Sequence, residues 1–225
     1  MKPLSFLKAL GVVVLPLAIT LVSLSMNSMR AGDKDDDRES RIKIGFRIAP
    51  VPLNLKGKDC RLVGYGSYLV NAVADCNGCH SAGPPTEYLP TGNPYFGHHT
   101  QKVNPATYLG GGRDFGPLIP GSAHIISRNL TPDETGRPEG GRSYGEFVKI
   151  MRTGLDLDHL HPTCSGAPNA NCVPPPFDGN LLQVMPWPAL QNMTDDDLRA
   201  IYEYLSAVPC IAGPPSPSPL HNDCR

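Results

Sequence analysis

The sequence lacks a charge excess of either sign, because its 20 Lys and Arg residues are balanced by 21 Asp and Glu residues. A nucleic-acid-binding domain usually carries a marked basic excess, so the composition gives no indication of that function. The chain has too much glycine and proline, 23 and 25 residues, for a helical bundle. Its apolar content of 40% is too high for outright disorder. A chain so rich in loops has a thin core unless disulfides, a metal or a large cofactor fill its centre.

Charged residues are absent from residues 9–26, a mostly apolar run that follows Lys2 and Lys8. A basic start followed by such a run is typical of a secretory signal peptide. The run also approaches the length needed to span a bilayer, so residues 1–31 are interpreted as a signal peptide or an N-terminal membrane anchor. Both interpretations place the rest of the chain outside the cytoplasm.

Residues 32–59 precede the first clear helical pattern. Residues 33–41 (DKDDDRESR) form a run of charge that indicates a solvated tether. Residues 42–55 alternate partly between apolar and polar side chains and then meet two prolines, which predicts an extended arm. At the other end of the chain, residues 211–225 are rich in proline and lack periodicity, so an irregular tail is predicted there.

Three segments have the apolar spacing of an amphipathic helix. They are residues 61–75, residues 143–153 with a capping box at Ser143, and residues 194–208 with the N-cap candidate Thr194. Residues 81–142 have almost no periodicity, and strands are predicted to be at most minor. Loops of that length are uncommon in a compact domain, and usually something other than protein organises them.

The segment Cys76-Asn77-Gly78-Cys79-His80 is a C-x-x-C-H motif. Two thiols three positions apart can both reach vinyl groups on one edge of a porphyrin and form thioethers, and the next histidine then lies under the iron. Gly78 is expected to let the backbone turn tightly beside the ring. The motif occurs once, so it predicts one covalent haem c, held by Cys76 and Cys79, with His80 as the proximal axial ligand.

Two other kinds of site share part of this motif. A thioredoxin-type C-x-x-C needs a βαβ context, which is missing here. A zinc site needs a second ligand pair at short spacing, and the sequence contains no other C-x-x-C and no H-x₃₋₅-H. A third alternative is a chance motif in an exported domain that disulfides hold together.

An electron carrier needs a second axial ligand on its iron, and methionine and histidine are the candidates. Met185 stands before Pro186, which favours an extended backbone that suits a side chain held against a metal. His124 and His161 are the alternative ligands, because each precedes the methionine segment. A thioether suits a carrier of high reduction potential, so Met185 is predicted as the distal axial ligand.

The order of these parts resembles a class I c-type cytochrome: a helix that runs into C-x-x-C-H, a long loop region, a middle helix, and a methionine loop before the closing helix. Three stretches resemble the cytochromes that serve periplasmic dehydrogenases, namely residues 66–70 (GSYLV), 129–133 (NLTPD), and Met185-Pro186-Trp187 through 200–205 (AIYEYL). The resemblance covers about residues 60–208, and residues 60–210 are assigned to the cytochrome domain.

This resemblance implies an all-α, cytochrome c-like haem domain with long loop insertions. It implies that the first and last helices cross, with Gly66 and Tyr68 on one side and Ile201, Tyr202 or Leu205 on the other. His80 and Met185 lie farther apart than in the smallest members of the family, so the inserted loops are expected to wrap over or beside the haem. Trp187, Tyr202 and Leu205 are expected to line or back the haem pocket.

The resemblance also implies a function, which is electron transfer by a mono-haem cytochrome of the periplasm, soluble or tethered to the inner membrane. One electron would pass per Fe(III)/Fe(II) cycle, between a dehydrogenase donor and a respiratory acceptor. The chain would then be an electron carrier and not itself an enzyme. The alternative is a haem enzyme or gas sensor, such as a peroxidase-like protein, with a displaceable sixth ligand and His124 or His161 as the distal acid–base group.

Five cysteines lie outside the motif, and close pairs in an exported protein usually form disulfides. The pairs nearest in sequence are Cys164 with Cys172 and Cys210 with Cys224, which leaves Cys60 free or intermolecular. The second pair would pin the proline-rich tail against the last helix. Each closed loop would contribute about 2–3 kcal/mol. Other pairings stay open, because spacing alone does not determine connectivity.

Overall fold

The computed structural model describes residues 35–97, 99–215, 218 and 220–224. The chain divides into two units, Met1–Arg41 and Ile42–Arg225. Residues 1–31, with the predicted signal peptide or anchor, lie outside the described residues. None of the helices in the described part has the length and apolar content that a membrane span requires.

In the first unit, residues 35–41 are helical. An ion pair one helical turn apart, 2.6 Å between Arg41 Nη2 and Asp37 Oδ2, accompanies this helix. Residues 35–41 of the predicted tether are therefore helical.

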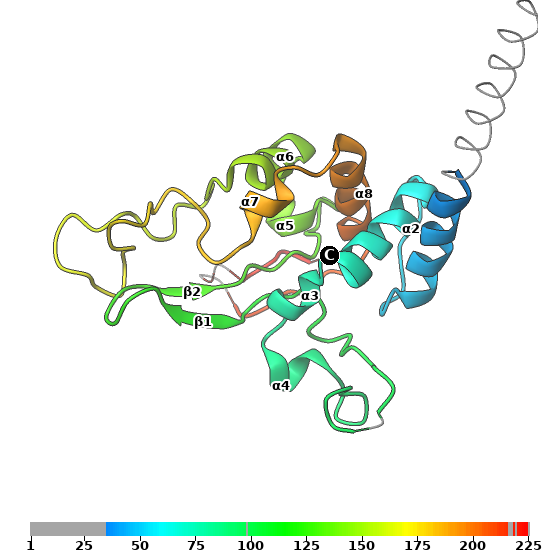
Figure 1. Ribbon diagram of the computed structural model, residues 1–225, viewed down its shortest axis with the longest axis horizontal. Coiled ribbons are helices and arrows are strands. Elements are labelled where there is room, and N and C mark those ends of the chain that lie inside the picture. The colour runs from blue at the N-terminus through cyan, green and yellow to red at the C-terminus, as the bar shows by residue number, and fades with distance from the viewer. Residues whose placement is uncertain (1–34, 98, 216–217, 219, 225) are drawn as a thin grey trace, which may run out of the picture. The chain divides into compact units, whose positions relative to one another are not determined.

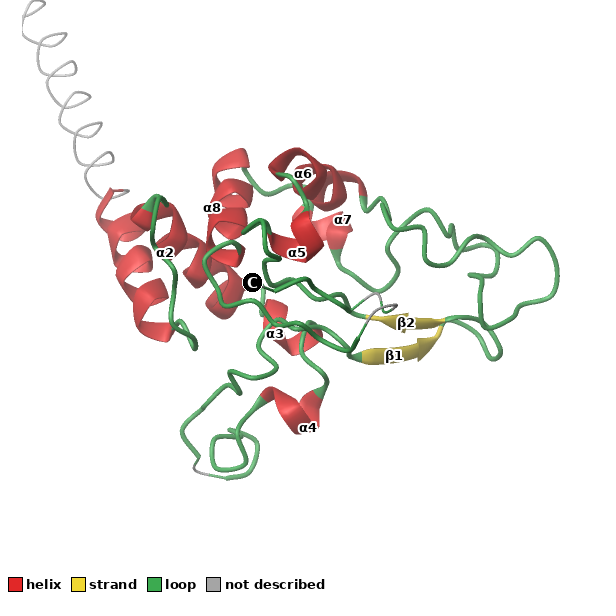
Figure 2. Ribbon diagram, turned by 180° about the vertical axis from the view of Figure 1, so that it is seen from behind, coloured by secondary structure: helices red, strands yellow, loops and turns green. Residues whose placement is uncertain are grey.

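Helices and one small sheet make up the regular structure of the second unit, and loops join them (Figure 1, Figure 2). The sheet pairs β1 and β2 antiparallel. In chain order the elements are α2 Cys60–Tyr68, the π-helix Leu69–Val73, α3 Cys76–Cys79, α4 Pro84–Glu87, β1 Asp114–Pro117, β2 His124–Ile126, α5 Pro138–Gly141, α6 Tyr144–Thr153, α7 Trp187–Leu190 and α8 Asp195–Leu205.

The three predicted helices are confirmed, and their caps explain where two of them begin. The Ser143 hydroxyl accepts from the Glu146 N–H while the Glu146 carboxylate accepts from the Ser143 N–H, so α6 starts with a full capping box. Thr194 and Asp197 form the same reciprocal pair at α8. Gly154 ends α6 with φ +67°, a conformation that costs glycine little. The first predicted helix is α2 continued by the π-helix, and α8 ends three residues before the predicted boundary.

Helices α2 and α8 cross at a glycine (Figure 1). A Cβ atom on Gly66 would lie 1.9 Å from the Ala200 carbonyl oxygen and 2.8 Å from the Tyr204 Cβ. The backbones can approach this closely only because Gly66 has no side chain. The expected crossing near Gly66 is confirmed, although the α8 atoms nearest to Gly66 belong to Ala200 and Tyr204 and not to the expected Ile201, Tyr202 or Leu205. Ala200 and Tyr204 face Gly66, because they stand four residues apart on one face of α8.

Residues 42–48 are helical, so the extended arm predicted from residue 42 is wrong over this stretch. Two glycines bring this helix against α2, since a Cβ on Gly45 would lie 1.9 Å from the Gly64 carbonyl oxygen. Ile42 and Phe46 cover Gly64 from the same side, and the Ser67 hydroxyl donates to the Gly45 carbonyl at 2.7 Å. Tertiary packing on α2 thus overrides a weak alternating pattern.

A hydrogen-bonded polar network lies inside the core between the π-helix, the loop before β1, and α8. The Tyr108 and Tyr204 hydroxyls are 2.7 Å apart, and Tyr108 also donates to Asn71 Oδ1 at 2.5 Å. Asn71 Nδ2 donates to Tyr204 Oη and to the Ser67 carbonyl. Burial raises the pKa of both tyrosines, so they stay neutral and keep their hydrogen bonds at physiological pH.

Replacing Tyr108 with phenylalanine is expected to lower the free energy of unfolding by about 1–3 kcal/mol, because loss of the hydroxyl leaves its two buried partners, Asn71 and Tyr204, incompletely paired. Urea unfolding measures this change. Tyr144→Phe is the matched control, since within the described part of the chain the Tyr144 hydroxyl donates only to the Asp195 carbonyl, at an exposed site. Equal stability of the Tyr108→Phe variant and the wild type would show that the network adds nothing.

Both predicted disulfides are present, Cys164–Cys172 and Cys210–Cys224, and Cys60 is an exposed free cysteine. The first disulfide closes a loop beside the β1–β2 hairpin, since the Ala123 N–H donates to the Cys172 carbonyl at 3.1 Å. In both ribbon views the hairpin and the loop after α6 extend from the helices on the same side (Figure 1, Figure 2). The second disulfide ties the tail to the residues that follow α8.

Candidate functional site

The C-x-x-C-H motif forms one helical turn, α3, followed by His80. Positions i and i+3 of a helix lie on the same face, so the turn presents the Cys76 and Cys79 thiols side by side. Neither thiol is in a disulfide, although the four cysteines of the two loops are all paired. The structure therefore keeps these two sulfur atoms available for other bonds.

Cys76 is the more enclosed of the two cysteines and packs against the core cluster that contains Tyr108 and Tyr204. Burial, helped by the negative charges of Asp75 and Cys79, raises the pKa of its thiol to about 12. The neutral thiol is a poor nucleophile for thiol–disulfide exchange, which proceeds through the thiolate. Cys79 is exposed at the end of the turn.

The His80 imidazole is oriented by a backbone carbonyl far along the chain. Its Nδ1 lies 2.8 Å from the Arg128 carbonyl oxygen, so Nδ1 carries the proton and donates it there. This tautomer leaves Nε2 with its lone pair, and no partner for Nε2 is found among the described residues. Burial lowers the pKa of His80, which favours the neutral ring that a metal requires.

Two antiparallel backbone segments form the support behind His80. Leu130 N–H donates to the Leu109 carbonyl, and Gly112 N–H donates to the Ser127 carbonyl. Between these bonds, the Gly111 N–H donates to the His80 carbonyl at 2.9 Å. A Cβ on Gly111 would lie 2.4 Å from the Arg128 carbonyl carbon, and its φ of +72° also favours glycine.

Polar side chains tie the motif itself to the same support. Asn77 Oδ1 accepts from the Leu109 N–H at 2.9 Å, and an Arg113 guanidinium N–H donates to the Gly78 carbonyl. The expected role of Gly78, a tight turn beside the ring, stays a prediction. A Cβ on Gly78 would lie 2.6 Å from an Asp75 carboxylate oxygen, a side-chain atom that can move aside.

These residues fit a covalently attached haem. Two unpaired thiols on one face are followed by a histidine whose Nδ1 is already bonded and whose Nε2 is available. Two buried polar atoms lie in or next to the motif, Asn77 Nδ2 within it and Ser81 Oγ directly after it, and neither has a hydrogen-bond partner among the described residues. Buried polar atoms are nearly always paired, so a further group beside the motif would account for both.

Met185 is half-buried against the core cluster and lies between two three-residue turns. Its N–H donates to the Gln183 carbonyl at 2.8 Å, and its own carbonyl accepts from the Trp187 N–H at 2.9 Å. Val184, inside the first turn, has φ +68°, which is strained for a β-branched residue and costs on the order of 1–3 kcal/mol.

Trp187 and Tyr202, which were expected to line or back the haem pocket, both pack against α6 or its end. The Trp187 ring covers Gly154 at the end of α6, and its Nε1 donates to the Leu182 carbonyl at 3.2 Å. Tyr202 packs edge-on against Tyr144 and donates to the Arg142 carbonyl at 2.9 Å. Both side chains hold α6 in place, and whether they also line a haem pocket stays a prediction.

Of the rival ligands, His124 is exposed and pairs with Asp114 across the β1–β2 hairpin at 2.8 Å. His161 lies in the loop after α6, and its buried Nδ1 has no partner among the described residues. Within the described residues, no hydrogen bond or ion pair joins either histidine to the motif.

Sequence reasoning missed Arg128, Gly111 and Asn77, which orient or support His80. The segment Asn129-Leu130-Thr131-Pro132-Asp133, which the resemblance singled out, begins directly after Arg128. That signal could have led to the neighbouring carbonyl. The bond itself has no signature in the residue type, because every residue carries a backbone carbonyl.

Two curated proteins match the chain, the cytochrome c subunits of alcohol dehydrogenase (quinone) from Gluconacetobacter polyoxogenes and Komagataeibacter europaeus. Each is 24% identical over 172 residues, which cover 73% of this chain and 27% of the relative. The chain thus spans about a quarter of the length of these relatives. No family model and no solved structure matches it. The chain is similar to cytochrome c subunits of a dehydrogenase, and this supports the coarser part of the resemblance, the likeness to cytochromes that serve dehydrogenases.

Proposed function

We propose that this chain is a mono-haem c-type cytochrome that transfers electrons in a periplasmic dehydrogenase assembly. The observation that carries the proposal is the His80–Arg128 hydrogen bond beside two unpaired thiols on one helical turn. Cys76 and Cys79 would hold the haem, and His80 Nε2 would bind its iron. When bound, haem would supply an iron centre that alternates between Fe(III) and Fe(II).

The proposed fold is a cytochrome c-like helical domain with long loops. The crossing of α2 and α8 at Gly66, and the π-helix that leads from α2 to the motif, support this assignment. A two-stranded sheet and long irregular loops accompany the helices, so the loops would form much of the surroundings of the haem.

Met185 is proposed as the sixth ligand of the iron. The strained turn at Val184 supports the assignment, because strain persists where surrounding structure holds a functional residue in place. Trp187, stacked on Gly154, anchors the turn on the other side of Met185. A thioether ligand favours the reduced iron and therefore a high potential.

The dehydrogenase role rests on the two relatives, whose names describe cytochrome c subunits of a quinone alcohol dehydrogenase. By this reasoning the chain receives electrons from a dehydrogenase and passes them to a respiratory acceptor, and it does not bind the substrate itself. The two disulfides support an oxidising compartment such as the periplasm. An N-terminal signal or anchor would place the domain there, soluble or tethered.

The test uses the full chain, produced in a host that matures c-type cytochromes. Covalent haem is expected on a haem-stained denaturing gel, together with a reversible one-electron titration of the folded protein. A colourless wild-type protein would overturn the proposal.

Replacement of Met185 by alanine is expected to remove the far-red charge-transfer band of the oxidised protein and to let carbon monoxide bind the reduced protein readily. Both effects follow from loss of the thioether that occupies the sixth position. Met193→Ala is the matched control, because Met193 also lies outside the helices, directly before the N-cap of α8, and is also partly buried. Rapid carbon monoxide binding by the wild type would instead favour the haem enzyme or gas sensor.

A further inference from the structure

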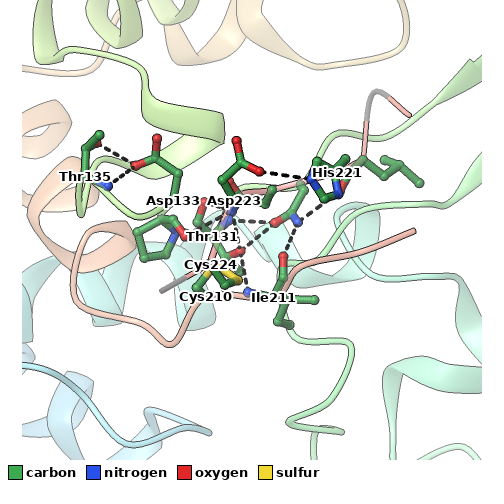
Figure 3. The surroundings of a disulfide bond; sticks show 12 residues. Thr131, Asp133, Thr135, Cys210, Ile211, His221, Asp223 and Cys224 are labelled. Atoms are coloured by element: carbon green, nitrogen blue, oxygen red, sulfur yellow. Dashed lines mark hydrogen bonds and ion pairs between the residues drawn. A yellow bond between two sulfur atoms is a disulfide. The ribbon is translucent and has the colours of Figure 1, made fainter. Parts of the chain in front are cut away.

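The C-terminal tail is bonded to the segment that follows Arg128 (Figure 3). The Cys210–Cys224 disulfide closes the tail into a loop. Inside this loop Asn222 is 3% exposed, and its Nδ2 donates at 3.0 Å to the carbonyls of both Thr131 and Pro132. The Asn222 N–H donates to the Ala212 carbonyl at 2.9 Å, and this bond joins the outgoing and returning halves of the loop.

Two further side chains continue this connection toward Arg128. The Thr131 hydroxyl accepts from the Ile211 N–H at 3.0 Å and donates to Asn129 Oδ1 at 2.7 Å. Asn129 Nδ2 donates to the Ile211 carbonyl at 2.8 Å and to the Leu220 carbonyl at 3.3 Å. Thr131 is fully buried and Asn129 nearly so. Asn129 shares a peptide bond with the carbonyl that accepts from His80.

The tail also covers residues 110–112, the second backbone segment that supports His80. Ile211 side-chain carbons lie 3.3–3.4 Å from the position of a Cβ on Gly110, and a Leu220 methyl lies 3.4 Å from that position on Gly112. Gly111 between them donates to the His80 carbonyl. The same two tail residues therefore hold both backbone segments that bond to His80.

We propose that the disulfide-closed tail is a brace that fixes the Arg128 carbonyl against the His80 imidazole, with Asn129, Thr131 and Asn222 as positioning residues. This inference rests on the proposed function, because His80 is taken there as the iron ligand. The brace acts on how strongly the His80 imidazole would donate electrons to the haem iron, and it thereby affects the reduction potential of the haem.

The direction of the effect follows from the hydrogen bond. A carbonyl held firmly against Nδ1–H makes the imidazole a stronger donor to a metal. A stronger donor favours Fe(III), so the intact brace lowers the potential. A loosened brace weakens the bond, raises the potential and exposes the Nδ1 proton to exchange with solvent.

The experiment compares haem-loaded wild type with Asn222→Leu, which removes the donors with little change in size and no change in charge, and leaves the disulfide in place. The equilibrium for reduction is expected to shift about threefold toward Fe(II), about 28 mV at 59 mV per tenfold. Exchange of the His80 Nδ1 proton in the reduced protein, followed by proton NMR, is expected to accelerate about tenfold. Asp223→Asn is the matched control, because Asp223 is exposed and pairs only with His221 among the interactions described.

Thr131→Val carries the same test if Asn222→Leu does not fold, since it removes the hydroxyl between Asn129 and Ile211. If neither folds, reduction of the tail disulfide in the folded wild type decides. If the wild type carries haem but the altered proteins have the same reduction potential and the same rate of Nδ1 proton exchange as the wild type, the brace is overturned and the proposed function stays intact. A wild type without haem would overturn both.

Discussion

The double variant Cys76→Ala/Cys79→Ala is expected to carry no covalent haem. The two thiols stand one helical turn apart beside His80, and no other pair of unpaired cysteines adjoins a histidine in the described part of the chain. Thioether bonds are the only links that survive a denaturing gel, so the haem stain should fall from full intensity to background. The measurement is that stain, compared with total protein in the same lane.

Cys164→Ala/Cys172→Ala is the matched control, because it also removes two cysteines but only opens the loop beside the β1–β2 hairpin. This variant should keep its haem while losing about 2–3 kcal/mol of stability. Covalent haem on the Cys76→Ala/Cys79→Ala protein would refute the assignment of these cysteines. Each single variant should retain one thioether and a weaker stain.

Gly66→Ala should destabilise the protein by about 3 kcal/mol, the upper part of the range for overpacking a close contact. The added methyl would lie 1.9 Å from the Ala200 carbonyl oxygen and 2.5 Å from its carbon. Both are backbone atoms of α8, so no side-chain rotation relieves the clash, and the two helices must separate. Urea unfolding should show a lower midpoint with an unchanged slope.

Gly145→Ala is the control, because Gly145 also lies in a helix but a Cβ there meets nothing within 4 Å. That variant should gain about 0.5–1 kcal/mol from the higher helix propensity of alanine. If both variants changed stability by the same amount, the close crossing at Gly66 would not be the cause.

The helices were predictable because their signals are local. Ser143 with Glu146, and Thr194 with Asp197, satisfy backbone donors within one turn, so the capping residues alone mark where α6 and α8 begin. The disulfides were predictable for a similar reason, since each joins cysteines close in sequence. Residues 42–48 carried no such signal, and their helix forms where Gly45 meets Gly64.

The C-x-x-C-H spacing by itself predicted which side chains could attach a haem, because two thiols three positions apart and the histidine that follows them need no distant partner. Only the tertiary structure decided which carbonyl orients His80, which residues of α8 meet Gly66, and which part of the tail lies against Thr131. These contacts join residues distant in sequence, often through backbone atoms that all residues share. The sequence therefore specifies such contacts only through the packing of the whole chain.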